Sequence, residues 1–82
     1  MSGQREVLLA TKETGEQARF LLEVFEDGEH WTSTLARLDA RGEPEPTRVA
    51  PRFHGLTAEQ ARRRMIQALE NDYDEVVTAP ER

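Results

Sequence analysis

The residues that could do chemistry are few, and they do not form a catalytic motif. The two histidines are His30 and His54, and no spacing links either of them to a nucleophile. Ser33 alternates with Trp31 on one face of a predicted strand, so we expect its hydroxyl to bond to backbone in the core. The nucleophile elbow and the oxyanion motif of serine hydrolases do not occur. We therefore expect no enzymatic activity and no catalytic residue.

Metal and cofactor sites are equally unsupported by the residue types. The sequence contains no cysteine, which excludes disulfides, thiol nucleophiles and cysteine-based zinc sites. Asp72, Asp74 and Glu75, with Glu70 nearby, lack the spacing and the glycine of a calcium loop. Carboxylates oppose the dipole at a helix C-terminus, so this cluster is expected to end a helix; the alternative is an acidic docking segment for a basic partner. We expect no cofactor and no metal.

Arg62, Arg63 and Arg64 suggest a phosphate-binding patch. Consecutive helical residues point about 100° apart, so these three side chains cannot form one patch. Arg62 lies at the edge of an apolar stripe, where its stem can pack while its head reaches solvent. Arg63 follows Glu59 by four residues, which is a favourable pair, and Arg64 emerges on the opposite shoulder. The triplet is therefore interpreted as helix surface.

Apolar periodicity predicts an α+β fold, in which a meander of three to four antiparallel strands precedes one amphipathic helix. The predicted strands are 5–11, 18–26, about 29–38 and, more weakly, 48–54, where Pro51 removes a backbone donor. The intervening turns contain Gly15, Asp27-Gly28 and the proline-rich loop 39–47. We expect a disordered N-terminus over 1–4, a single domain over 5–76 and a flexible tail over 77–82.

Asp27-Gly28 predicts a specific register for the second hairpin. A two-residue type I′ turn here would give the pairs Val24 with Trp31, Leu22 with Ser33 and Phe20 with Leu35. In this register Trp31 is the central aromatic residue of the core.

The helix is expected to begin near Thr57. Gly55 ends the preceding strand, and Thr57 with Gln60 fits a capping box. The apolar stripe that follows consists of Ala58, Ala61, Met65, Leu69 and Val76, with Ile66, Ala68 and Tyr73 on its shoulders. The end of the helix stays open between Asn71 and Val76.

One helix covers only one face of a sheet, so the other face is the candidate binding surface. By alternation it carries Arg19, Leu21, Glu23, Phe25, His30, Thr32, Thr34 and Ala36, joined by Arg48, Ala50, Arg52 and His54 if that segment is a strand, and by Leu8. The predicted partner surface is Leu21, Phe25, His30, Thr32, Arg48 and Arg52. Leu8, Leu21 and Phe25 would form an exposed apolar patch of the kind that often marks an interface, although scattered surface apolar residues are also normal.

This face favours a small binding or regulatory module that acts through protein–protein contacts. The partner would be an unknown protein or a second copy in a homodimer. The alternative is single-stranded nucleic-acid binding, with Phe25 and His30 stacking on bases and Arg19, Arg48 and Arg52 holding the backbone. The net charge of −5 disfavours a polyanionic ligand.

The order of four strands and a helix is similar to the repeat unit of the PUR and Whirly single-strand binding proteins, which implies the nucleic-acid alternative. The stretch FEDGEHW, followed later by GLTAEQA, resembles HicB-type antitoxins, which place a strand, a turn and an aromatic residue before a capped helix. This second resemblance covers fewer than half of the residues and lacks the DNA-binding extension of many of those proteins. No functional residue is carried across.

The setting can also be inferred from composition. No apolar run approaches the roughly 18 residues of a membrane span, and no hydrophobic signal core is present, so we expect a cytoplasmic protein with no membrane contact. Arginine outnumbers lysine ten to one, and alanine and glutamate are common, which is typical of a GC-rich bacterial genome.

Overall fold

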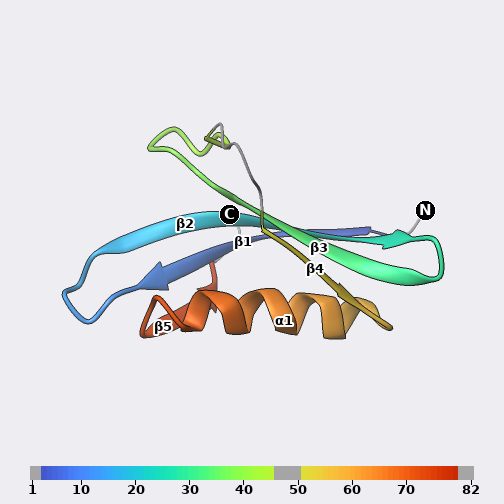
Figure 1. Ribbon diagram of the computed structural model, residues 1–82. Helices are drawn as coiled ribbons and strands as arrows, with labels where there is room; N and C mark the ends of the chain where they lie inside the picture. Colours follow the sequence, from blue (N-terminus) through green and yellow to red (C-terminus); the bar gives the residue numbers. More distant parts are fainter. Residues whose placement is uncertain (1–2, 46–50, 80–82) are drawn as a thin grey trace.

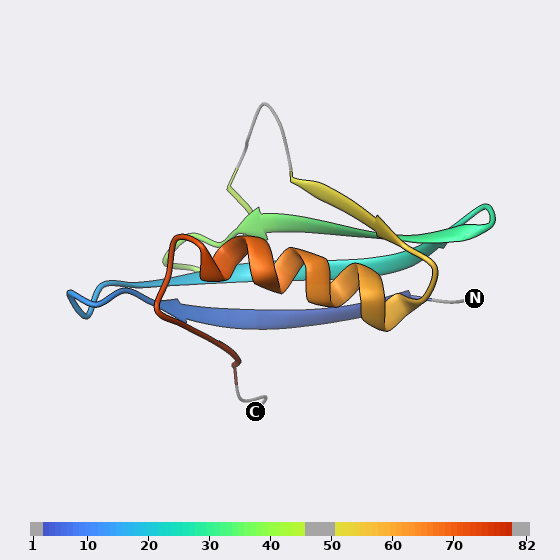
Figure 2. The same ribbon diagram turned by 60° about the horizontal axis from the view of Figure 1, so that its bottom comes forward.

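The structure is a computed structural model that describes residues 3–45 and 51–79, and these residues form one antiparallel sheet with one helix packed on it (Figure 1). The elements are β1 (Gly3–Thr11), β2 (Gln17–Asp27), β3 (His30–Arg37), β4 (Arg52–Gly55), α1 (Ala58–Glu70) and β5 (Glu75–Thr78). The strand order is β4-β3-β2-β1-β5, so α1 carries the chain from one edge of the sheet to the other (Figure 2). The predicted α+β class and meander are confirmed, and the fifth strand is an addition to them.

β5 occupies the region where the end of the helix was uncertain. Asn71 is the C-cap of α1, and the chain turns back toward β1 immediately after it. Asp74 N–H donates to Thr11 O at 2.9 Å, and Ala79 N–H donates to Val7 O at 2.8 Å. Val76 therefore packs on the core from a strand and not from the helical stripe. The strands begin at Gly3 and reach Thr78, beyond the predicted domain bounds of 5 and 76.

The hairpin between β2 and β3 has a different turn from the predicted one. Gly28 has a φ of 68°, no non-glycine residue of the described chain has a positive φ, and Asp27 pairs with His30. The turn is therefore centred on Gly28 and Glu29, with the positive φ at its first central residue as in a type II′ turn. The type I′ prediction is wrong.

The register of this hairpin is shifted by two residues as a result. The observed pairs are Val24 with Ser33, Leu22 with Leu35 and Phe20 with Arg37. Because the shift is even, every side chain keeps its predicted face. Trp31 moves to the end of the sheet beside Gly55 and is only half-buried, so the buried aromatic residue of the core is Phe20.

The core lies between α1 and one face of the sheet. Its members are Leu8, Ala10, Ala18, Phe20, Leu22, Val24 and Leu35 from the sheet, and Ala61, Met65 and Leu69 from α1. Ser33 is fully buried in this layer, and its hydroxyl donates to Ala61 O at 2.8 Å, which confirms the predicted bond to backbone.

The predicted start of α1 is also confirmed. Gln60 N–H donates to Thr57 Oγ1 at 3.0 Å, while the Gln60 side chain accepts from Leu56 N–H and not from Thr57 itself. Among the described residues no helix is long and apolar enough to cross a membrane.

The three consecutive arginines of α1 have three different partners. Arg62 reaches Glu6 of β1 through two bonds, with Nε–Oε2 at 2.7 Å and Nη2–Oε1 at 3.0 Å, so its head does not simply point into solvent. Thr78 of β5 donates to the same carboxylate at 3.0 Å. Arg63 bonds Glu59 at 3.3 Å as predicted, and Arg64 donates to His54 O at 2.6 Å. The interpretation of the triplet as separate side chains without a common patch is confirmed.

Close packing of α1 on β4 requires Gly55 to lack a side chain. A Cβ at this position would lie 2.7 Å from Ala61 N and 3.0 Å from Gln60 Cβ. We expect Gly55→Ala to lower the free energy of unfolding by about 1–3 kcal/mol, measured by urea denaturation, because α1 must move away from β4. Gly3→Ala is the matched control, since its Cβ would be 3.6 Å from Val24 O, an ordinary contact. Equal effects of the two substitutions would contradict this explanation.

The pair of Arg62 and Glu6 predicts a pH-dependent stability. The hydrogen bond from Arg62 lowers the pKa of Glu6 below its ordinary value, and this effect outweighs burial, which raises the pKa. The ionised Glu6 carboxylate therefore contributes fully to the free energy of unfolding above its unfolded-state pKa of about 4.3. This contribution is lost as the pH falls through the lower folded-state pKa.

We expect Arg62→Ala to reduce the free energy of unfolding by about 1–2 kcal/mol at pH 7, because it leaves a partly buried carboxylate without its main donor. The difference from the wild type should shrink as the pH falls below about 4.3. Arg63→Ala removes only the exposed pair with Glu59 and should change stability by less than about 0.5 kcal/mol. Denaturation at several pH values checks both statements, and a pH-independent difference for Arg62→Ala would be evidence against them.

Candidate functional site: the open face of the sheet

One face of the sheet is not covered by α1 (Figure 1). Burial alternates along β2, where Leu22 and Val24 are buried toward α1 while Leu21, Glu23 and Phe25 remain partly exposed on the other side. The strand registers extend this side across the sheet. We call it the open face, and it comprises Gly3, Arg5, Val7, Leu9, Thr11, Gln17, Arg19, Leu21, Glu23, Phe25, Asp27, His30, Thr32, Thr34, Ala36, Arg52, His54, Glu75 and Val77.

The predicted partner residues that the structure describes all have the register of the open face; they are Leu21, Phe25, His30, Thr32 and Arg52. Thr32 is fully buried, so the prediction that it contacts a partner is wrong. Arg48, like Ala50, lies outside the described residues.

Leu8 is a correction to the predicted face. It pairs with Phe20 and is 1% exposed, so it belongs to the core under α1. Residues 7–10 are apolar at every position, and alternation alone therefore could not assign their faces. Val7 and Leu9 lie on the open face in its place.

Apolar side chains cross the middle of the open face as a band. Val7 pairs with Leu21, and Leu21 pairs with Ala36; two residues along β1, Leu9 pairs with Val77. All five are at least partly exposed, and Val77 is 43% exposed. These residues are the apolar band. Val7, Leu9 and Val77 were missed in the sequence, because their positions depend on the pairing of β1 and β5.

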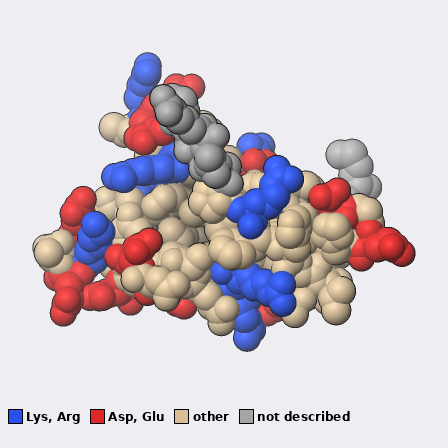
Figure 3. All heavy atoms as spheres, in the orientation of Figure 1, with Lys and Arg blue, Asp and Glu red and all other residues tan. Residues whose placement is uncertain are grey.

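Charges of both signs border the apolar band. On one side, Glu23 pairs with Arg5 across the strands, with Nε–Oε2 at 3.2 Å, and Arg52 lies in the same row beyond Thr34. On the other side, Arg19 lies opposite Leu9 and forms no ion pair with a described residue. In Figure 3 acidic side chains gather at the two ends of the molecule, over its hairpin turns. The open face is therefore a surface of mixed charge around an apolar centre.

A polar cluster closes the end of the open face next to the turn between β2 and β3. Thr32 is fully buried; its hydroxyl donates to Asp27 Oδ2 at 3.3 Å and lies 3.0 Å from His54 Nδ1. Because the hydroxyl has one proton, a bond donated to Asp27 requires it to accept from His54 Nδ1–H. The rings of His30 and His54 meet edge to face with centroids 4.9 Å apart.

This cluster carries little chemistry of its own. The Thr32 hydroxyl is enclosed and cannot reach a substrate. Among the described residues no three histidine or acidic side chains are placed to hold a metal ion. The hydrogen bonds therefore serve to satisfy a buried hydroxyl and to orient His54.

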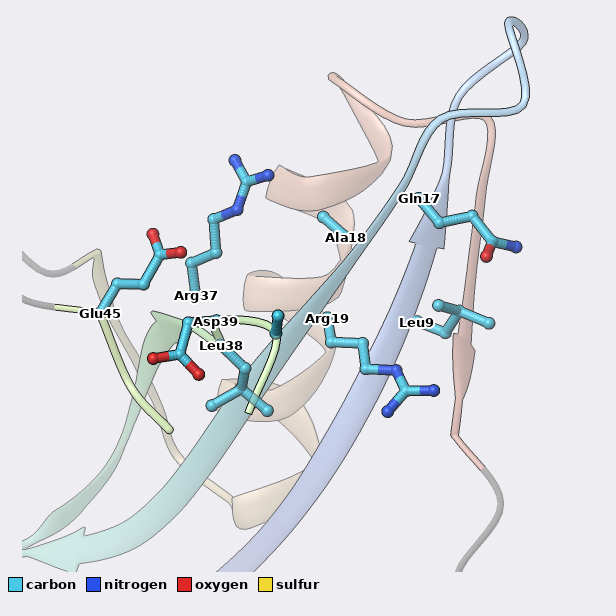
Figure 4. A pocket seen from close by; sticks show the side chains of 9 residues that line it. Leu9, Gln17, Ala18, Arg19, Arg37, Leu38, Asp39 and Glu45 are labelled. Atoms are coloured by element: carbon cyan, nitrogen blue, oxygen red, sulfur yellow. The ribbon is translucent and has the colours of Figure 1, made fainter. Parts of the chain in front are cut away.

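A hollow of about 490 Å³ lies between the open face and the loop after β3 (Figure 4). Arg19 and Arg37 line it, but their side chains point in different directions, and Arg37 pairs with Phe20 on the α1 side. Asp39 Oδ1 accepts from the backbone of Arg41 and Glu43 at 2.8 and 3.0 Å, which shapes the loop. The hollow has no converging polar groups of the kind that fix a small ligand.

The hydrogen bonds of Thr32 predict different effects for two equivalent substitutions in β3. Thr32→Val removes a hydroxyl that links Asp27 and His54, and we expect a loss of about 1 kcal/mol in the free energy of unfolding. Thr34→Val changes a half-buried residue on the same strand and face, and should stay within about 0.5 kcal/mol of the wild type. Thermal denaturation measures both. The hydrogen-bond assignment fails if Thr34→Val costs as much as Thr32→Val.

Comparison with known proteins identifies no relative of this chain. No family model matches the chain, and no curated protein or solved structure shows significant similarity to it. β5 also follows the helix, whereas the resemblance to the PUR and Whirly repeat rests on four strands and a helix. The function must therefore be argued from the open face itself.

Proposed function

We propose that this chain is a small non-enzymatic binding module that acts through protein–protein contacts on its open face. The observation that carries the proposal is the apolar band, in which Val7, Leu21 and Ala36 form one row across three strands away from α1. Exposed apolar surface that is continuous and rimmed by charge is typical of protein interfaces. The lack of cysteine and the arginine-rich composition support a bacterial, cytoplasmic setting for this module.

Single-stranded nucleic acid is the alternative ligand. Phe25 is partly exposed on the open face, and Arg19 forms no described ion pair, so both could contact an oligonucleotide. The charges argue against it. Glu23 lies in the middle of the face and engages Arg5, and the net charge of the chain is −5. A protein ligand, which accepts mixed charge, fits this surface better.

Photo-crosslinking from the open face tests the proposal. A photoreactive phenylalanine analogue at position 25 should give a protein adduct in cells that express the chain. The same analogue at position 63, an exposed site on α1 away from the open face, should not. In parallel, purified chain is titrated with a mixed-sequence single-stranded oligonucleotide at 50 and 200 mM salt. Salt-sensitive oligonucleotide binding with no protein adduct at position 25 would replace the proposal by its alternative.

A further inference from the structure

We propose that the protein bound by the open face is a second copy of this chain, stacked face to face about a two-fold axis that crosses β2 at Leu21. The axis lies in the interface and runs perpendicular to the strands. This inference rests on the proposed function and names its partner.

The charges along β2 are arranged for such an axis. Arg19 and Glu23 lie two residues before and after Leu21, on the same face of the strand. A two-fold axis across the strand at Leu21 exchanges its two ends. Arg19 of each copy then lies against Glu23 of the other, and the contact occurs twice in the dimer. Leu21 meets its own counterpart in the apolar centre.

The other two-fold axis in the plane of the face would run along β2. It leaves the ends of the strand in place, so Glu23 would oppose Glu23 and Arg19 would oppose Arg19. Like charges in direct opposition strongly disfavour an interface. The charge pattern therefore selects the axis perpendicular to the strands.

The loop after β3 agrees with the same choice. It rises on the side of the sheet opposite α1 (Figure 1), and its described part carries Asp39, Glu43 and Glu45 against one arginine, Arg41. The perpendicular axis brings this acidic loop over the far end of β3 and β4 in the second copy, where Arg52 and His54 lie. The parallel axis would bring it toward the edge that contains Glu75 of β5.

The area of the open face suits a weak, reversible pair. Its strands contain 9, 11, 8, 4 and 4 residues, so at about 3.3 Å per residue and about 4.8 Å between strands the face covers roughly 570 Å² for each copy. This is below the roughly 800 Å² per partner of a standard stable interface and falls in the range of transient complexes.

Two opposite charge reversals give a test specific to this geometry. Arg19→Glu alone sets two glutamates against each other in both contacts, and Glu23→Arg alone sets two arginines against each other in both. Each variant should dimerise at least tenfold more weakly than the wild type. A mixture of the two variants can form a heterodimer in which both contacts join a glutamate to an arginine, so it should recover the wild-type dissociation constant to within about threefold. The double variant, which carries both reversals in one chain, restores an opposite-charge pair at both contacts and should dimerise within about threefold of the wild type.

Sedimentation velocity from about 1 µM to 1 mM measures all of these species. The weakening by each single variant together with the recovery by the double variant is the decisive observation. The axis along β2 would leave like charges opposed in the wild type and in all three variants, so it predicts no such difference between them. Loss of dimerisation in the double variant, as deep as in the single variants, would contradict the perpendicular axis.

Controls separate the interface from folding. The Glu23 side chain is 44% exposed and Arg19 is exposed, so far-UV circular dichroism should show all variants folded. The same reversals at Glu59 and Arg63 on α1 should leave dimerisation unchanged. Arg5→Ala, which removes only the bond from Arg5 to Glu23 within one chain, should change the dissociation constant by less than about threefold.

The outcomes distinguish this inference from the proposed function. A wild-type chain that stays monomeric up to 1 mM, or a double variant that does not associate, overturns the two-fold stack. If position 25 still crosslinks to a different protein in cells, the open face remains a protein-binding surface with another partner. If the chain is monomeric and position 25 yields no protein adduct, both are wrong.

Discussion

One helix of 13 residues must cover one face of a sheet of five strands, and this size difference determines the other features of the molecule. A helix with its side chains is about 10–12 Å wide, whereas five strands span roughly 24 Å. α1 therefore needs fixed points in different strands as well as apolar contact. Ser33 in β3 bonds to Ala61, Gly55 in β4 allows close approach, and Glu6 in β1 takes Arg62. The other face of the sheet has no second layer from the described residues to cover it.

The sequence predicted the parts of the fold that depend on local pattern. The start of α1 at Thr57 and the faces of β2 follow from a cap and from alternation, and both are confirmed. β5 was missed because it has four residues and pairs with a strand more than 60 residues earlier, so no local signal marks it. The turn at Gly28 was mispredicted because a glycine after aspartate fits two turn types that differ by two residues in register.

The candidate site shows the same division between local and distant information. Alternation predicted that Leu21, Phe25 and Thr32 share a face, but it could not supply the neighbours of that face. The apolar band needs the register of β1 with β5, and the bond between Thr32 and His54 joins residues 22 positions apart. The residues that share a face along one strand can thus be predicted from the sequence. Their neighbours on adjacent strands can be assigned only when the order and register of the strands are known.

The half-buried state of the apolar band explains how one chain can tolerate an uncovered sheet face. Cross-strand neighbours such as Val7 and Leu21 shield each other, so part of their apolar surface already leaves water when the monomer folds. Only the remaining exposed part is available to a partner. Affinity equals the favourable free energy of contact minus the entropy cost of association, and the small remaining apolar area supplies little of the former. A surface of this kind therefore favours reversible binding, and the charges around it decide which partner is bound. The pattern of Arg19, Leu21 and Glu23 therefore matters more for the choice of partner than for the stability of the fold.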